Sequence, residues 1–242
     1  MEKQQGMELV FGIHPIIELL NAKRRKIYTI YTTKPEPKAW PKILKLLPKY
    51  TKIEFISKEK LSKLADSTDH QGVVALASPF IIRKKFFNPE KEKFLLMLDS
   101  IQDPRNLGAI LRSAHCTGVN GVIVTERNST FLTPTAIKSS AGLVEHLEIY
   151  FAPNAKSAVD ELKKAGYTIY VSNLENSKSA LDVDFTLPCC VIIGNEGEGV
   201  SPSILKSGQS IKLPQVTADI SYNASVAAGI LLFLISTKNK II

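Results

Sequence analysis

The sequence is poor in cysteine, and its few cysteines and histidines are not arranged as metal ligands. Of the 242 residues 3 are cysteines, Cys116, Cys189 and Cys190, and they form no CxxC pair. The 4 histidines are scattered at spacings that do not match metal-binding motifs. We therefore expect neither a disulfide framework nor a structural metal. The adjacent pair at 189–190 opens an apolar run, which is typical of small hydrophobic side chains packed in a strand.

The sequence also lacks long apolar runs. Segments such as 94–98 and 229–235 are far shorter than the roughly 20 residues that a membrane-spanning helix needs. The first residues, MEKQQGMELV, lack the basic and then apolar layout of a signal peptide. Hydrophobic residues make up 44% of the chain, which is ordinary for a globular protein with a sizeable core. These features predict a cytoplasmic protein that does not bind a membrane.

Positive charge is concentrated in the first part of the chain. The net charge is +8; residues 1–92 contain 18 Lys and Arg against 10 Asp and Glu, and residues 93–242 contain 13 of each. A segregated basic module is typical of a segment that binds a polyanion, because each neutralised phosphate releases counterions. A solvated, lysine-rich surface is the alternative that charge alone leaves open.

The hydrophobic pattern divides the chain into two domains. Before residue 79, HPIIELLNA and EPKAWPKILKLLPKY have helical spacing, and KIYTIYTT, KIEFIS and GVVALAS resemble strands. The stretch PFIIRKKFFNPEKEK has proline near both ends and no clear period, as a linker does. We predict a first domain over 1–78, a linker over 79–92 and a second domain over 93–242.

The second domain alternates strands with helices. Strand-like runs are FLLMLDSI, GVIVTE, HLEIYFA, YTIYVSN, CCVIIG and SIKLP; helical segments are NLGAILRSAHCTG, TPTAIKSSAG, AKSAVDELKKAG and YNASVAAGILLFLIS. This alternation predicts an α/β fold with a largely parallel sheet covered by helices on both faces. Ligands of such sheets bind beyond the carboxyl ends of the strands. Three unusual loops follow strands there, at 99–108, 194–201 and 213–223.

The loop in VIIGNEGEGVS is rich in glycine but does not match a phosphate-binding motif. It has no lysine of the Walker type, and the last position of a GxGxxG motif is occupied by Pro202. Glu196 and Glu198 would repel a pyrophosphate. The glycines therefore favour close backbone approach to a ligand without polyphosphate, with Ser201 as a cap and Pro202 beginning a helix. A purely structural turn is the alternative.

Three motifs carry a family resemblance. DPRNLGAILRSAHCTGVNGVI, IIGNEGEGVS and LPQVTADISYNASVAAGI, in this order, resemble the motifs of the SpoU family of RNA ribose 2′-O-methyltransferases (TrmH-like), which belongs to the trefoil-knotted SPOUT class. The chain is most similar to the bacterial 23S rRNA guanosine-2′-O-methyltransferase subgroup. FGIHPIIELL and DHQGVVA also resemble that subgroup's substrate-binding domain, which has an L30e-like fold. The resemblance covers nearly the whole chain.

The resemblance implies a knotted catalytic domain that binds S-adenosyl-L-methionine as methyl donor and acts as a homodimer on RNA rather than DNA. This donor is a sulfonium cation without phosphate, which suits a glycine loop that contains glutamates. The implied substrate is a guanosine of 23S rRNA. Alternatives are the same chemistry on tRNA or at another rRNA site, or a non-catalytic RNA-binding or resistance protein of the same fold.

The resemblance also implies which residues form the site. The expected catalytic residues are Asn106, Arg112, Glu196, Ser221 and Asn223, and the expected main-chain contacts to the cofactor are Gly194, Leu213 and Tyr222. A residue at the position of Arg112 is the activator of the ribose hydroxyl in this family, either as a base or as a fixed cation. The sequence departs from the family pattern at Tyr222 and Ala224, where leucine and valine are common, and at His115-Cys116, which replaces Glu-Ala.

Overall fold

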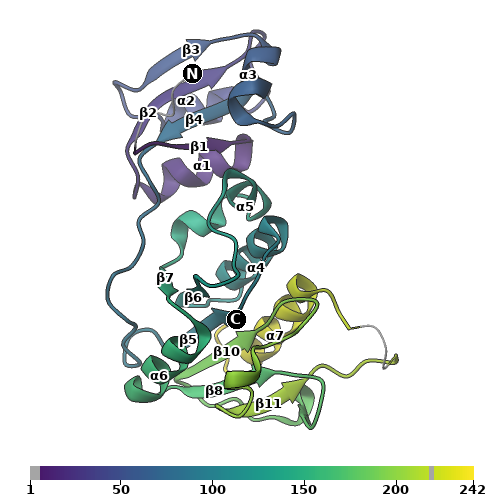
Figure 1. Cartoon of the computed structure of the whole chain (residues 1–242). Coiled ribbons are helices and arrows are strands. Elements are labelled where there is room, and N and C mark those ends of the chain that lie inside the picture. The colour runs from purple at the N-terminus through teal and green to yellow at the C-terminus, as the bar shows by residue number, and fades with distance from the viewer. Residues whose placement is uncertain (1–5, 218–220) are drawn as a thin grey trace. The chain divides into compact units, whose positions relative to one another are not determined.

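The structure, a computed structural model, describes residues 6–217 and 221–242. These residues form two compact units (Figure 1). The first unit contains the described residues up to Ile81 together with Leu132–His146, and the second contains Ile82–Phe131 and the described residues from Leu147 onward. The segment Leu132–His146 therefore packs with the N-terminal unit, although the residues on both sides of it in the sequence belong to the second unit.

The first unit is built on a sheet with the strand order β1-β4-β2-β3. The strand β4 is antiparallel to both β1 and β2, and β2 is parallel to β3. The expected strands and the first helix are confirmed, whereas the second helix is shorter than expected and follows prolines at 35 and 37. The elements are β1 Glu8–Phe11, α1 Ile13–Ala22, β2 Ile27–Thr32, α2 Trp40–Leu46, β3 Lys52–Phe55, α3 Lys58–Ala65, β4 Val73–Ala77, α5 Pro134–Ser139 and η1 Leu143–His146.

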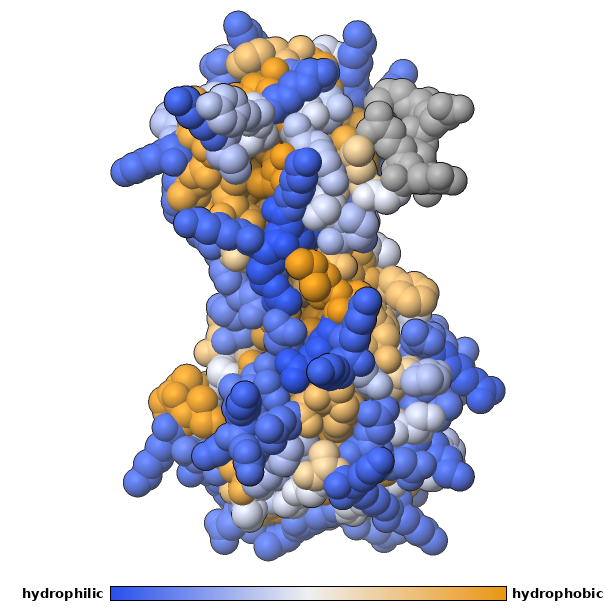
Figure 2. Space-filling view, turned by 90° about the vertical axis from the view of Figure 1, so that its left-hand side faces the viewer, coloured by the Kyte–Doolittle hydropathy of each residue, from blue (hydrophilic) through white to orange (hydrophobic). Residues whose placement is uncertain are grey.

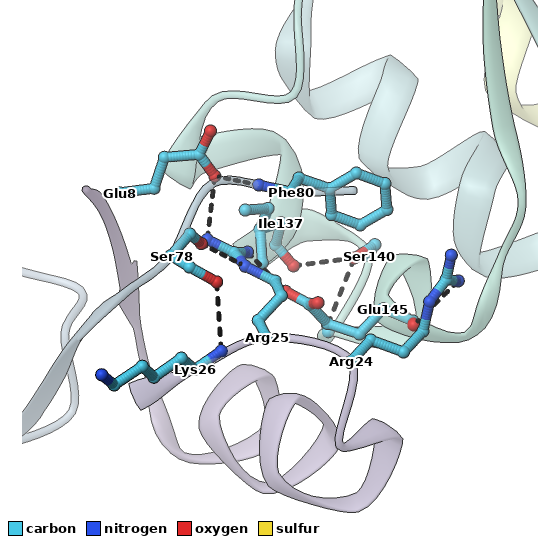
Figure 3. A network of polar contacts seen from close by, with 10 residues as sticks. Glu8, Arg24, Arg25, Lys26, Ser78, Phe80, Ile137, Ser140 and Glu145 are labelled. Atoms are coloured by element: carbon cyan, nitrogen blue, oxygen red, sulfur yellow. Dashed lines mark hydrogen bonds and ion pairs between the residues drawn. The ribbon is translucent and has the colours of Figure 1, made fainter. Parts of the chain in front are cut away.

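The segment 132–146 is joined to the rest of the first unit by tight packing and by a buried charge network. A Cβ atom at Gly142 would lie 2.5 Å from the Cα atom of Pro15 in α1, and its φ is +83°, so glycine alone suits this position. The side chain of Arg25 is 1% exposed, and its Nη1 atom lies 2.8 Å from Oε1 of Glu145. Figure 3 shows that these side chains point toward one another at the end of α1.

Two further oxygens complete the contacts of Arg25. Its Nη2 atom lies 2.8 Å from Oε2 of Glu8, and its Nε atom donates to the carbonyl of Ser78 at 2.7 Å. Burial raises the pKa of Glu145, although the neighbouring Arg25 guanidinium acts in the opposite direction. One guanidinium thus connects three parts of the unit that are far apart in the sequence.

The second unit is built on a sheet with the strand order β7-β6-β5-β10-β8-β11-β9, in which every neighbouring pair is parallel. The six expected strands and four of the expected helices in this part of the sequence are confirmed, and one of these helices, α5, packs with the first unit. The elements are β5 Phe94–Leu98, α4 Pro104–Cys116, β6 Gly121–Thr125, β7 Ile149–Ala152, α6 Ala155–Ala165, β8 Thr168–Ser172, β9 Lys178–Ser179, η2 Ala180–Asp182, β10 Cys189–Ile193, η3 Pro202–Ile204, β11 Gln209–Lys212 and α7 Ala224–Lys238.

Helices cover both faces of this sheet (Figure 1). Alternate strand residues such as Leu95, Met97 and Ile192 pack against α6, and α7 packs against α4 and β10. Cys189 and Cys190 are buried in β10, as expected, and burial raises the pKa of Cys189 to about 12. The sheet core is therefore apolar, and polar chemistry is confined to its edges.

The C-terminal helix is held at both sides of its last turn. Ser236 Oγ donates to the carbonyl of Thr117 at 2.6 Å, and Lys238 Nζ donates to the carbonyl of Val183 at 2.9 Å.

On the face shown in Figure 2, hydrophilic side chains surround smaller apolar patches. None of the helices in the described ranges has the length and apolar character needed to cross a membrane.

Candidate active site

A buried carboxylate directly after β5 holds the loop that follows β10, which is part of the candidate site. Asp99 is 2% exposed, and its main-chain N–H donates to the carbonyl of Ile193 at 2.9 Å. Its Oδ2 atom accepts from the N–H of Ser201 at 2.7 Å, and its Oδ1 atom accepts from the hydroxyl of Ser100 at 3.2 Å. Asp99 thereby fixes both ends of the glycine loop that follows β10.

This glycine loop is a compact turn with its own hydrogen bonds. The main chains of Asn195 and Gly199 pair in both directions, at 3.1 and 3.2 Å. The side-chain oxygen of Asn195 also accepts from the N–H groups of Gly197 and Glu198, at 2.9 and 2.7 Å. These bonds fix the conformation of the loop from Asn195 to Gly199.

The chain crosses itself closely at the base of the loop. A Cβ atom at Gly194 would lie 2.1 Å from the carbonyl carbon and oxygen of Gly199. The expectation of a helix capped by Ser201 is wrong in detail, because Pro202 begins only a 3-10 turn and the Ser201 side chain makes no capping bond. Glycine is thus required at 194 by the protein's own backbone, whatever ligand the loop approaches.

Three of the expected catalytic side chains form one hydrogen-bonded cluster. Asn106 lies in the first turn of α4, which begins at Pro104 after the N-cap Asp103. The Nδ2 atom of Asn106 donates to Oε1 of Glu196, and its Oδ1 atom accepts from Nδ2 of Asn223 at 3.3 Å. Loops after β5, β10 and β11 therefore converge, as the rule for parallel sheets predicts.

Asn223 has a second role at the start of α7. Its Oδ1 atom accepts from the N–H of Ser225 at 2.9 Å and from the Ser225 hydroxyl at 2.6 Å. It is thus the N-cap of α7, and the cap fixes its amide nitrogen toward Asn106. One residue both begins the helix and completes the cluster.

A cavity of about 450 Å³ lies beside this cluster. Its lining includes all three expected main-chain contacts and two of the expected catalytic residues: Gly194, Leu213, Tyr222, Glu196 and Ser221. Its charged lining residues are Glu175, Glu196, Glu198 and Lys212, three carboxylates against one ammonium. The cavity therefore favours a cation and disfavours a phosphorylated ligand.

Arg112 is not part of the cluster. It is exposed on α4 and lies six positions after Asn106, which places the two side chains about 120° apart around the helix axis. Within the described ranges, no hydrogen bond or ion pair involves its guanidinium. The structure thus brings Asn106, Glu196 and Asn223 together and leaves Arg112 available to an external group.

Sequence reasoning missed the organising roles of Asp99 and Asn195. Both were visible only as polar residues that follow a buried strand, at the ends of β5 and β10. A polar side chain in that position is a usable signal, because the carboxyl edge of a parallel sheet is where ligands bind. The sequence does not reveal the partner of such a side chain, however: Asp99 accepts from Ser201, which lies 102 positions away.

Comparison with known proteins places the chain in a family. Residues 93–233 match the SpoU rRNA methylase family, and residues 9–81 match the family described as RNA 2′-O ribose methyltransferase substrate binding. The chain belongs to the SpoU family of RNA methyltransferases. A relative named "Putative TrmH family tRNA/rRNA methyltransferase" from Staphylococcus haemolyticus is 36% identical over 193 residues, which are 77% of each chain.

Solved structures support the fold. One described as an RNA 2′-O ribose methyltransferase has a TM-score of 0.85 at 23% identity and covers 98% of this chain and 90% of its own. An rRNA methyltransferase from Sinorhizobium meliloti, described as AdoMet-bound, has a TM-score of 0.80 at 21% identity and covers 97% and 88%. The expected fold class, the α/β fold of the SPOUT methyltransferases with a separate small N-terminal α/β unit, is confirmed.

Proposed function

We propose that this protein transfers a methyl group from S-adenosylmethionine to a ribose 2′-hydroxyl of RNA. The observation that carries this proposal is the acidic, glycine-lined cavity beside the cluster of Asn106, Glu196 and Asn223. The family of the chain and the AdoMet-bound relative of known structure support it.

The residues of the cavity fit this cofactor. When bound, S-adenosylmethionine supplies a methyl group on a positively charged sulfonium centre. Main-chain groups of Gly194, Leu213 and Tyr222 would hold it, and apolar side chains such as Leu205 and Leu231 give the cavity walls on which an adenine ring can pack. The excess of carboxylates suits a cation, and the absence of phosphate in the ligand removes the repulsion that a nucleotide cofactor would meet.

We assign Arg112 as the group that acts on the ribose. A 2′-hydroxyl is a weak nucleophile until its proton is removed or its oxyanion is stabilised. A guanidinium is too basic to accept a proton readily, so Arg112 acts as a fixed cation beside the developing oxyanion, and the hydroxyl proton is released to solvent water as the oxygen is methylated. Glu196 and Asn223 orient groups around the reacting oxygen, and the Ser221 hydroxyl lines the cavity next to them.

The test compares two exposed arginines on the same helix. Arg105 and Arg112 are seven residues apart on α4 and share a face of it. In single-turnover methyl transfer with RNA and cofactor saturating, Arg112→Ala should lose at least about 100-fold in rate, as expected when a stabilising charge is removed. Arg105→Ala should stay within a few-fold of wild type. A near-normal rate for Arg112→Ala would move the activating role to Glu196 or Ser221.

We further propose that the substrate is a guanosine of 23S rRNA. The proposal rests on the resemblance of the chain to that subgroup and on the match of residues 9–81 to a substrate-binding family. Mapping of 2′-O-methyl groups in total rRNA and tRNA of a strain lacking the gene tests it. Loss of one site in 23S rRNA supports the proposal, and loss of a tRNA site, which the relatives' name also covers, would replace it.

We also propose that the protein acts as a homodimer through α7. Three apolar side chains, Val226, Ile230 and Phe233, are 48%, 41% and 59% exposed and recur at helical spacing on one face. An apolar stripe of this kind on a protein surface is typical of an interface. The family resemblance supports a second copy of the chain as the partner.

A further inference from the structure

The first unit contains a cavity of its own, of about 330 Å³. Three segments of that unit form its walls: the stretch after β2, the start of α3 and the turn before β4. They contribute Thr33, Lys34, Pro35, Pro37, Lys58 and the turn His70–Gly72. The cavity belongs entirely to this unit, separate from the candidate active site.

The charge of this cavity is the opposite of that in the second unit. Lys34 and Lys58 line it, and no aspartate or glutamate does. Among the described residues neither lysine forms an ion pair, although hydrogen bonds, and to a smaller extent the charge of the adjacent Lys58, lower the pKa of the Glu59 carboxyl. Lys34 Nζ lies 4.6 Å from the ring centroid of Phe55. Two cations that line one concave surface without an ion-pair partner, where no carboxylate lines it, give that surface a positive potential, although Glu59 and Asp69 lie nearby. The cavity therefore selects an anion.

A buried histidine fixes one wall without adding charge. His70 is 1% exposed, and its Nδ1 atom accepts from the N–H of Gly72 at 3.0 Å. Its Nε2 atom therefore carries the proton and donates to Ser62 Oγ, also at 3.0 Å. Burial lowers the pKa of His70, and Lys58 acts in the same direction, so the ring is neutral. The positive charge of the cavity thus comes from the two lysines.

The absence of a side chain at Gly72 lets the same turn pack closely against the stretch after β2. Its φ is +80°, and a Cβ atom there would lie 3.1 Å from Cγ of Pro37 and 3.4 Å from Oγ1 of Thr33. The hydroxyl of Thr32 donates to the Gly72 carbonyl at 2.9 Å, which anchors the turn to the end of β2. The cavity is therefore formed before any ligand arrives, and binding does not require the loop to order.

We propose that this cavity binds a backbone phosphate of the substrate RNA, held between Lys34 and Lys58, with the attached unpaired nucleotide packed on Pro35 and Pro37. This inference rests on the proposed function, because it takes RNA as the substrate. Lysine acts as a point charge toward phosphate, and such contacts position an RNA without reading its sequence. The cavity therefore contributes affinity and register, and it takes no part in the methyl transfer.

The experiment uses the full-length protein and four forms of it: wild type, Lys34→Gln/Lys58→Gln, and the single controls Lys63→Gln and Lys45→Gln. Lys63 lies on the same helix as Lys58 but does not line the cavity, and Lys45 is an exposed lysine of α2. The affinity for an rRNA fragment is measured over a series of salt concentrations. Cofactor affinity and the single-turnover rate with saturating RNA are measured in parallel.

The double variant should bind RNA about tenfold or more weakly. The slope of log affinity against log salt should become shallower by about 0.7 for each phosphate that the protein no longer neutralises. Cofactor affinity and the saturating rate should not change, and each control should bind RNA within about twofold of wild type. The opposite result is a double variant that binds RNA as well as the controls do, while the wild-type protein methylates RNA. That result would overturn the proposal that the cavity binds RNA and would leave the proposed function intact.

Two other outcomes are decisive. Inorganic phosphate is titrated into the wild-type protein at constant ionic strength, because a free anion has the same chemistry as the RNA backbone. Saturable phosphate binding that the double variant loses while its RNA affinity is unchanged would assign the cavity to a free anion instead. A wild-type protein that neither binds nor methylates any RNA would overturn the cavity proposal together with the proposed function.

Discussion

Arg25 shows how a single buried charge depends on every one of its partners. Its guanidinium contacts oxygens of Glu8, Ser78 and Glu145, and the Glu145 side chain is itself only 1% exposed. The second carboxylate oxygen of Glu145, Oε2, is buried and has no hydrogen-bond partner within the described ranges. If one partner of a buried ion pair is removed, the other charge stays buried without compensation, and the protein is strongly destabilised. Replacing both partners by apolar residues of similar size changes the stability much less.

Arg25→Ala should therefore lower the free energy of unfolding of the first unit by about 3–5 kcal/mol, because it leaves a buried carboxylate uncompensated. Lys26→Ala, which removes an exposed positive charge next to it, should change stability by less than about 0.5 kcal/mol. Urea unfolding followed by circular dichroism measures both. Equal stabilities for the two variants would show that the network contributes little to the fold.

His70 predicts a pH dependence with a definite sign. Its pKa in the folded protein lies below 6.5, the ordinary value for a histidine side chain. Between these two pKa values the unfolded state binds more protons, so the free energy of unfolding rises with pH there. Stability should fall as the pH is lowered through about 6.5, and His70→Asn, which keeps an acceptor near Nδ1, should lose this component. Parallel curves for the two proteins between about pH 5 and 8 would exclude His70 as the cause.

At the scale of elements, the strands of the second unit were predictable because they are buried on both faces. Parallel strands of this kind are short continuous apolar runs bounded by turn residues, and FLLML and GVIVT are examples. By contrast, α3 was not predicted. It reads KEKLSKLA and buries only Leu61 and Ala65, so its helical period is weak in such a short window.

The composition of the candidate site was predictable in part, and its geometry was not. The motifs name Asn106, Glu196 and Asn223, but their hydrogen bonds depend on the placement of β10 beside β5, which no local pattern specifies. The same is true of the contact between Asp99 and Ser201. Periodicity predicts elements; the order of strands is set by packing over the whole unit.

The glycine loop after β10 provides a matched pair of substitutions. Gly194→Ala should lower the melting temperature and abolish cofactor binding, because its Cβ atom collides with the main chain of Gly199. At Gly197 the nearest atom to a new Cβ is Oδ1 of Asn195 at 3.6 Å, so Gly197→Ala should fold normally. Thermal unfolding and cofactor titration by calorimetry distinguish them. A stable, cofactor-binding Gly194→Ala protein would contradict the observed crossing of the chain.

At the scale of the whole molecule, the apolar face of α7 predicts the oligomeric state. Phe233→Glu should convert the proposed dimer into a monomer, because it places a charge within the stripe of Val226 and Ile230. Phe131→Glu is the matched control, since Phe131 is 60% exposed but lies outside α7. Size-exclusion chromatography with light scattering measures the mass of each. A dimeric Phe233→Glu protein would move the interface elsewhere.

The first unit is discontinuous in sequence, which has a consequence for dividing the protein. Segment 132–146 owes its packing to residues before Ile81, through the contact of Gly142 with Pro15 and the pair of Glu145 with Arg25. His146 Nε2 also lies 2.8 Å from Oε2 of Glu18. A fragment that begins in the linker keeps the segment and lacks all three partners.

A fragment from Lys91 to Ile242 should therefore expose side chains such as Val144, which is fully buried in the intact protein, and should aggregate or bind a hydrophobic dye. The same fragment with residues 132–146 replaced by a Gly/Ser segment of equal length should remain folded and bind the cofactor. Its RNA affinity should be weaker and its salt dependence shallower than those of the full chain, because the basic unit is missing. Circular dichroism, dye binding and calorimetry compare the two fragments. If the unmodified fragment is as well folded as the replaced one, segment 132–146 does not depend on the N-terminal unit. A cut near residues 79–92 would then be enough to separate two independently folded parts.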